Sequence, residues 1–262
     1  MTNRSHVPTI IAVAICAYAA CDMIHEVLGH GTAVLLSRDV RALSLTTVAL
    51  QTSSSSRWVA AAGTLANLLA GVIALALAGR RPRFDATRFF FLLLGGINFL
   101  NAAGYFIFSA VLGGGDWAVV IASARPEIAW RIVMGAVGLV SYAAVVALIV
   151  GEFSRLVHES LLAPSEVPTL VFPAYLAGAL LLVAGAAMNP ISPALILLSG
   201  ASTGFGAMAG LLFVPGIVEN RVRDTAWPGD EALPASRGWI VAGVIVAIVF
   251  VFVIGRGIQI AK

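Results

Sequence analysis

The residues best suited to chemistry in this sequence are two histidines and a glutamate in the stretch HEVLGH at residues 25–30. The stretch lies inside an otherwise apolar run, where an ionisable side chain at the centre of a membrane helix costs about 2.5–3.5 kcal/mol. Residues retained at that cost mark a functional site. Because neutral imidazoles bind zinc and a nearby carboxylate can take a proton from a metal-activated water, the stretch predicts a zinc site.

The spacing of the two histidines differs by one residue from the metalloprotease signature HExxH. Five residues of a regular α-helix turn about 140°, which would point His25 and His30 apart. A π-helical turn, with about 4.4 residues per turn, would bring them to within roughly 50° of each other, and Gly29 and Gly31 make such a distortion easy. We expect this bulge. The competing geometry is a regular helix in which Glu26 pairs with His30 and becomes a metal ligand.

The elements that must position these side chains are membrane helices. The chain has 262 residues, of which 60% are apolar and 11% charged, and its mean hydropathy is +0.96. These values exclude a soluble globular domain and predict an all-α polytopic membrane protein with about six to seven transmembrane helices. The candidate spans lie near residues 8–36, 57–79, 88–112, 128–151, 169–188, 192–215 and 238–258.

Between the first two spans, residues 38–57 are rich in β-branched residues and alternate between apolar and polar positions, which predicts a small membrane-associated β segment. The net charge of +3 comes mostly from arginines in short loops, a pattern that suits a lipid bilayer. No basic stripe with interleaved aromatic residues is present, so we expect no nucleic-acid partner.

Three stretches together resemble the site-2 protease family of intramembrane zinc metalloproteases. The first is HEVLGHGTAVLLS in the first span, and it precedes the β segment. The second, AAGTLANLLAGVIALAL (61–77), has Gly63 and Asn67 where that family has a glycine-to-asparagine signature. The third, NFLNAAGYFIFSAVLGGGDW (98–117), is similar to the family's asparagine and later aspartate. The resemblance implies a metalloprotease-like membrane core over residues 1–125, and residues 126–262 would add transmembrane helices without an assigned role.

The resemblance also implies a role for each matching residue. His25, His30 and Asp116 would bind one Zn²⁺ per chain, and Glu26 would be the general base. The substrate backbone or the oxyanion would be bound by the amides Asn67, Asn98 and Asn101.

Two departures from the family pattern bear on these roles. The histidine motif has its extra residue, and Trp117 follows the aspartate where the family usually has glycine. An aspartate at a glycine break also serves as a turn or helix-cap residue. Asn67 after Gly63 is likewise a pattern that packs membrane helices together.

We therefore predict an integral, multi-pass membrane zinc metalloendopeptidase, of a bacterial-type plasma membrane, that cleaves transmembrane protein substrates. A transmembrane substrate must unwind before cleavage, and the strands near residues 40–50 offer an edge to receive it. One alternative is a non-proteolytic metal-binding or regulatory protein on the same scaffold. Another is a transporter with a proton relay through Asp22, His25, Glu26 and His30.

Overall fold

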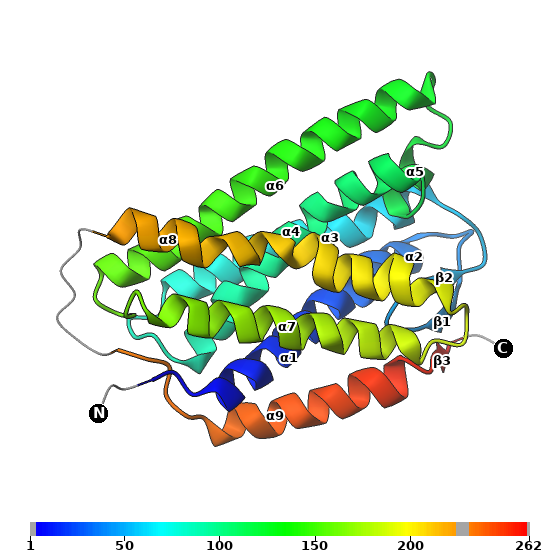
Figure 1. Ribbon diagram of the computed structural model, residues 1–262. Helices are drawn as coiled ribbons and strands as arrows, with labels where there is room; N and C mark the ends of the chain where they lie inside the picture. Colours follow the sequence, from blue (N-terminus) through cyan, green and yellow to red (C-terminus); the bar gives the residue numbers. More distant parts are fainter. Residues whose placement is uncertain (1–3, 224–230, 261–262) are drawn as a thin grey trace.

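The computed structural model describes residues 4–223 and 231–260. Within these residues it contains seven helices long and apolar enough to cross a membrane (Figure 1). They are Val7–Leu36, Arg57–Gly79 (α3), Ala86–Leu112 (α4), Glu127–His158 (α6), Glu166–Ala187 (α7), Ile196–Val222 and Arg237–Ile254. The all-α class and the number of long apolar helices agree with the sequence prediction, because a run of about 20 apolar residues is a strong local signal.

Three of the seven helices change geometry along their length. The first consists of α1 (Val7–Met23), the π-helical segment η1 (Ile24–Gly31) and α2 (Thr32–Leu36). The sixth and seventh are also divided, into η2 (Ile196–Gly206), η3 (Ala207–Phe213) and α8 (Val214–Val222), and into α9 (Arg237–Ile248) and η4 (Val249–Ile254). A short helix, α5 (Asp116–Ile121), lies between α4 and α6.

Helix α1 is the centre of the bundle and packs against α4, α7 and α9. Two glycines permit this packing. A Cβ on Gly243 of α9 would lie 2.7 Å from the Cα of Ala12, and a Cβ on Gly178 of α7 would overlap the ring of Tyr18. The backbones therefore approach closely at small residues, as is usual between membrane helices. The close packing holds α1, and with it η1, between helices from both halves of the chain.

A small sheet lies at the end of the bundle where the C-terminal strand is found (Figure 1). The predicted β segment forms two antiparallel strands, β1 (Ala42–Leu45) and β2 (Leu50–Thr52). A third strand, β3 (Ile258–Gln259), pairs antiparallel with the other edge of β1, giving the order β2-β1-β3. Sequence analysis did not predict β3, because a two-residue strand has no periodicity to detect.

Candidate metal centre

The segment η1 brings the two histidines together. It is π-helical from Ile24 to Gly31, so the predicted bulge is confirmed and the regular-helix alternative is wrong. The rings of His25 and His30 have centroids 4.7 Å apart and planes at 88° to each other. Both side chains are buried, with 2% and 7% of their surface exposed. The extra residue in HEVLGH is thus absorbed by the wider helical turn.

Helix α3 supports η1 through direct backbone contact. A Cβ on Gly29 would lie 2.5 Å from the Cα of Gly63, and a Cβ on Gly63 would lie 2.5 Å from Nε2 of His25. Neither position has space for a side chain. These two glycines therefore set the distance between η1 and α3 at the level of the histidines.

Each imidazole is oriented by an acceptor on α3. The Nδ1–H group of His25 donates to Oδ1 of Asn67 at 2.6 Å, and that of His30 donates to the carbonyl of Val59 at 2.6 Å. The orientation of the Asn67 amide is fixed because its Nδ2 donates to the carbonyl of Cys21 and to Oδ1 of Asn98. Each ring thereby directs Nε2 toward Asp116, and a neutral imidazole with its proton on Nδ1 can bind a metal through Nε2.

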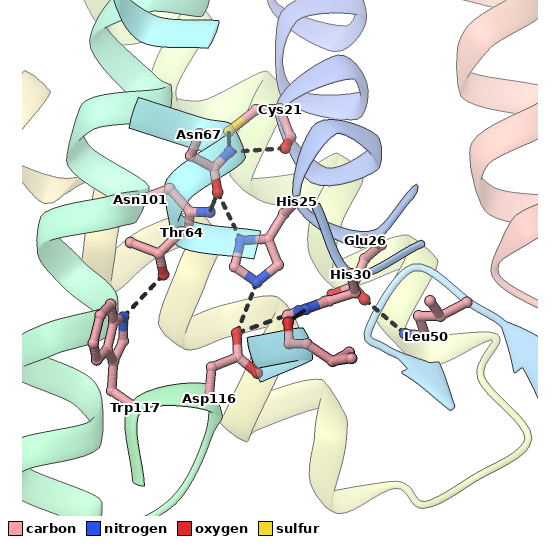
Figure 2. Close-up of polar contacts among 11 residues, drawn as sticks. Cys21, His25, Glu26, His30, Leu50, Thr64, Asn67, Asn101, Asp116 and Trp117 are labelled. Atoms are coloured by element: carbon pink, nitrogen blue, oxygen red, sulfur yellow. Dashed lines mark hydrogen bonds and ion pairs between the residues drawn. The ribbon is translucent and has the colours of Figure 1, made fainter. Parts of the chain in front are cut away.

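Asp116 contacts the other ring nitrogen, Nε2, of both histidines (Figure 2). Its Oδ2 lies 2.9 Å from Nε2 of His25 and 3.3 Å from Nε2 of His30. The Asp116 side chain makes no helix-capping hydrogen bond, since the N-cap of α5 is Gly115. Burial favours the neutral carboxyl, but the contacts with His25 and His30 outweigh it and hold the pKa of Asp116 well below its usual range. Asp116 is therefore a carboxylate at neutral pH.

Asp116 is held in place by the turn before it and by the residue after it. Gly113 and Gly115 adopt positive φ angles of 65° and 76°, which let the chain reverse between α4 and α5. Trp117 donates from Nε1 to Oγ1 of Thr64 at 3.0 Å and stacks on Phe106. The tryptophan that departs from the family pattern thus anchors α5 to both α3 and α4.

Glu26 lies beside the two histidines. It is 4% exposed, and its Oε2 accepts a hydrogen bond of 2.6 Å from the backbone N–H of Leu50, the first residue of β2 (Figure 2). Ligand atoms of His25, Glu26 and His30 lie within 4.8 Å of one another. The sheet therefore orients the carboxylate, and Glu26 is near enough to serve either as a base or as a ligand.

This donor set fits a divalent metal ion. Two imidazole lone pairs and a carboxylate oxygen converge, and such electron-rich atoms repel one another unless a proton or a cation lies between them. Two nitrogens and one oxygen are ligands that several transition metals accept, zinc among them. The site thus has the chemistry that metal binding requires.

The three asparagines predicted to bind substrate form one buried cluster. Asn67 and Asn98 are fully buried and Asn101 is 3% exposed. Nδ2 of Asn101 donates to Oδ1 of Asn67 at 3.2 Å, and Nδ2 of Asn98 donates to the carbonyl of Leu94. In this conformation Asn67 orients His25, and only Asn101 borders a cavity. A role for the three in substrate binding stays a prediction.

Sequence analysis missed one aromatic residue of the site. Tyr105 stacks on the ring of His25 with centroids 4.7 Å apart and planes at 24°. It follows Asn101 by four residues on α4, so the helical period already placed the two on one face. That spacing was a signal that could have identified Tyr105.

Comparisons with known protein families, with curated proteins and with solved structures find no match to this chain. The geometry of the site is therefore the basis for assigning a function. Its central feature is the convergence of His25, His30 and Asp116, with Glu26 alongside.

Proposed function

We propose that this protein is a multi-pass membrane metalloprotease of the site-2 protease type, which hydrolyses peptide bonds of membrane-embedded protein substrates. The observation that carries the proposal is the approach of Nε2 of His25 and Nε2 of His30 to one carboxylate oxygen of Asp116, at 2.9 and 3.3 Å. The adjacent Glu26 supplies the base that hydrolysis requires.

Exposed apolar side chains support insertion in a membrane. A soluble protein seldom leaves contiguous apolar patches of more than a few hundred Å² on its surface, whereas a lipid-facing helix must do so. Large apolar residues are exposed along the outer helices, among them Leu65, Leu69, Val72, Leu139, Val140, Val241 and Val244. The site on η1 would then lie at membrane depth.

His25, His30 and Asp116 would hold the metal ion, which we propose is Zn²⁺. Catalytic zinc sites have three protein ligands and keep one position open for water or substrate. When bound, zinc would polarise the scissile carbonyl and acidify a water molecule. The hydrogen bonds from the two Nδ1–H groups to Asn67 and Val59 hold the rings in the orientation that metal binding needs.

Glu26 would move the proton. Its carboxylate would accept a proton from the attacking water and return it to the leaving amine. The N–H of Leu50 would keep the carboxylate aimed at the site through both steps.

Strand β2 would receive the substrate. It pairs with β1 on one side and is an edge strand of the sheet. The N–H of Leu50 reaches Glu26, so this strand borders the site. A transmembrane substrate unwound near its scissile bond could pair with β2, since an extended peptide adds to a sheet edge through backbone hydrogen bonds.

Metal analysis combined with a cleavage assay tests the proposal. We expect His25→Ala, His30→Ala and Asp116→Ala to lose zinc, because each removes one ligand. Glu26→Gln should keep zinc and abolish cleavage of co-expressed single-span membrane proteins tagged at both ends. His158→Ala and Glu152→Gln, which change the same residue types at the end of α6, should retain both properties.

The outcomes separate the alternatives. Loss of zinc from Glu26→Gln would make Glu26 a ligand and remove the base from the mechanism. Stoichiometric zinc in a protein that cleaves none of a broad substrate library would favour the regulatory, non-proteolytic alternative. Purified wild-type protein without any bound divalent metal would overturn the proposal.

A further inference from the structure

A polar cavity, the one that Asn101 borders, lies on the side of His25 and Glu26 toward η2 and α7. It is lined by oxygen-bearing residues from four separate segments of the chain: Asp22 of α1, Thr47 in the turn between β1 and β2, Asn101 of α4, and Ser199 and Thr203 of η2. The cavity shares His25 and Glu26 with the metal centre. We propose that it holds a sodium ion at a position separate from the zinc.

Three oxygen atoms in the cavity lack hydrogen-bond partners among the described residues. They are Oδ2 of Asp22, Oγ1 of Thr47 and Oδ1 of Asn101, and all three atoms are buried. Thr47 and Asn101 are only 4% and 3% exposed as whole residues. Buried polar atoms are nearly always satisfied in native proteins, and an unsatisfied one costs about 1–3 kcal/mol. Three such atoms on one cavity therefore indicate a bound species.

The charge of the cavity indicates that this species is a cation. Among the described residues that line it there is no lysine or arginine, whereas Asp22 and Glu26 both contribute a carboxylate. In the proposed function the metal ion's two positive charges are balanced by Glu26 and Asp116. An ionised Asp22 has no partner of opposite charge among the residues that line the cavity, and a buried charge is stable only when paired. One further positive charge balances the site.

The ligand atoms favour a monovalent hard cation. A carboxylate, an amide carbonyl and hydroxyl groups are hard oxygen donors, which suit alkali and alkaline-earth ions better than zinc. A single unbalanced carboxylate calls for one positive charge rather than two. The cavity has room for about one water-sized species, which fits a sodium ion and excludes organic cations.

Thermal unfolding of the zinc-loaded protein in lipid nanodiscs tests the sodium site. Sodium chloride is exchanged for choline chloride at constant ionic strength, and zinc content is measured in every sample. A ligand that binds only the folded state raises the unfolding temperature, by about 5 °C when it is 100-fold above its Kd. We expect a saturable increase with sodium and none with choline. Because the charge count rests on the proposed metal, the zinc measurement reports separately on that proposal.

Variants locate the effect. Asp22→Asn should abolish the sodium response while keeping zinc. Thr47→Val, which keeps the shape of the side chain but removes the hydroxyl, should weaken the apparent sodium affinity by about tenfold. Two serines of η2 give a matched pair of variants. Ser199→Ala should also weaken the apparent sodium affinity, because Ser199 lines the cavity. Ser202→Ala should not change that affinity, because the Ser202 hydroxyl donates to the carbonyl of Leu198 and Ser202 does not line the cavity.

Two results would overturn the sodium site. One is a wild-type unfolding temperature that is the same in sodium and choline, which would mean that a water molecule or a proton on Asp22 satisfies the cavity. The other is a sodium response unchanged in both Thr47→Val and Ser199→Ala. These two variants keep the test decisive if Asp22→Asn fails to fold.

Discussion

Replacing Gly63 by alanine tests how α3 positions the metal centre. A Cβ at this position would lie 2.5 Å from Nε2 of His25, whereas ordinary contact begins near 3.4 Å. The imidazole would have to move by about 0.9 Å to accept the methyl group. Zinc–nitrogen bonds are about 2.0–2.1 Å long and tolerate deviations of about 0.2 Å. The displaced ring could not remain a ligand.

The expected size of the effect follows from this displacement. Disturbing a residue that only supports a ligand weakens metal binding by about 10–100-fold. Displacing the ligand itself should weaken zinc binding by more than about 100-fold, or ~2.8 kcal/mol. Alanine is favoured over glycine within a helix by about 0.5–1 kcal/mol, so α3 itself should not be weakened. Gly63→Ala should therefore lose zinc and activity while remaining helical.

The assay is zinc affinity by competition with a chelator, together with helical content by circular dichroism. Gly151→Ala is the control, because a Cβ at this helical position would meet nothing within 4 Å. It should bind zinc like the wild type. A Gly63→Ala protein with zinc affinity within threefold of the wild type would refute the placement of His25 against α3.

Three further predictions concern the residues that support the site. Asn67→Ala removes the acceptor for Nδ1 of His25 and should lower zinc affinity by about 10–100-fold in the same competition assay. Trp117→Phe keeps an aromatic ring but removes the hydrogen bond from Nε1, and zinc affinity should fall by about 2–10-fold. Arg131 donates to two carbonyl groups at the end of α4. Arg131→Ala should therefore lower the free energy of unfolding, measured in a denaturant titration, by about 1–3 kcal/mol. Arg131→Lys should recover part of this loss.

Each of these predictions can fail independently. Unchanged zinc affinity in Asn67→Ala would show that His25 does not need this partner. A Trp117→Phe protein without any zinc would mean that the indole does more than anchor α5. Equal stability of Arg131→Ala and the wild type would show that water satisfies the end of α4 equally well.

The sequence by itself determined the features that depend on local pattern. Runs of about 20 apolar residues identified the seven long helices, because each run is complete within one segment. The five-residue spacing of His25 and His30, with glycines beside His30, predicted the π-helical turn, because helix geometry alone relates spacing to direction. The same motif gave the prediction that Glu26 is the general base.

The tertiary structure decided what those residues contact. Asn67 and Asp116 reach His25 from 42 and 91 residues away along the chain. Sequence analysis predicted that Asn67 binds substrate, which stays a prediction. Its hydrogen bond with the imidazole of His25 could not be predicted, because no local pattern identifies that partner. The pairing of β3 with β1 and the cavity around Asp22 likewise depend on how distant helices pack. Hydropathy and periodicity act within a segment, whereas hydrogen-bond partners and buried charges are fixed only when the segments meet.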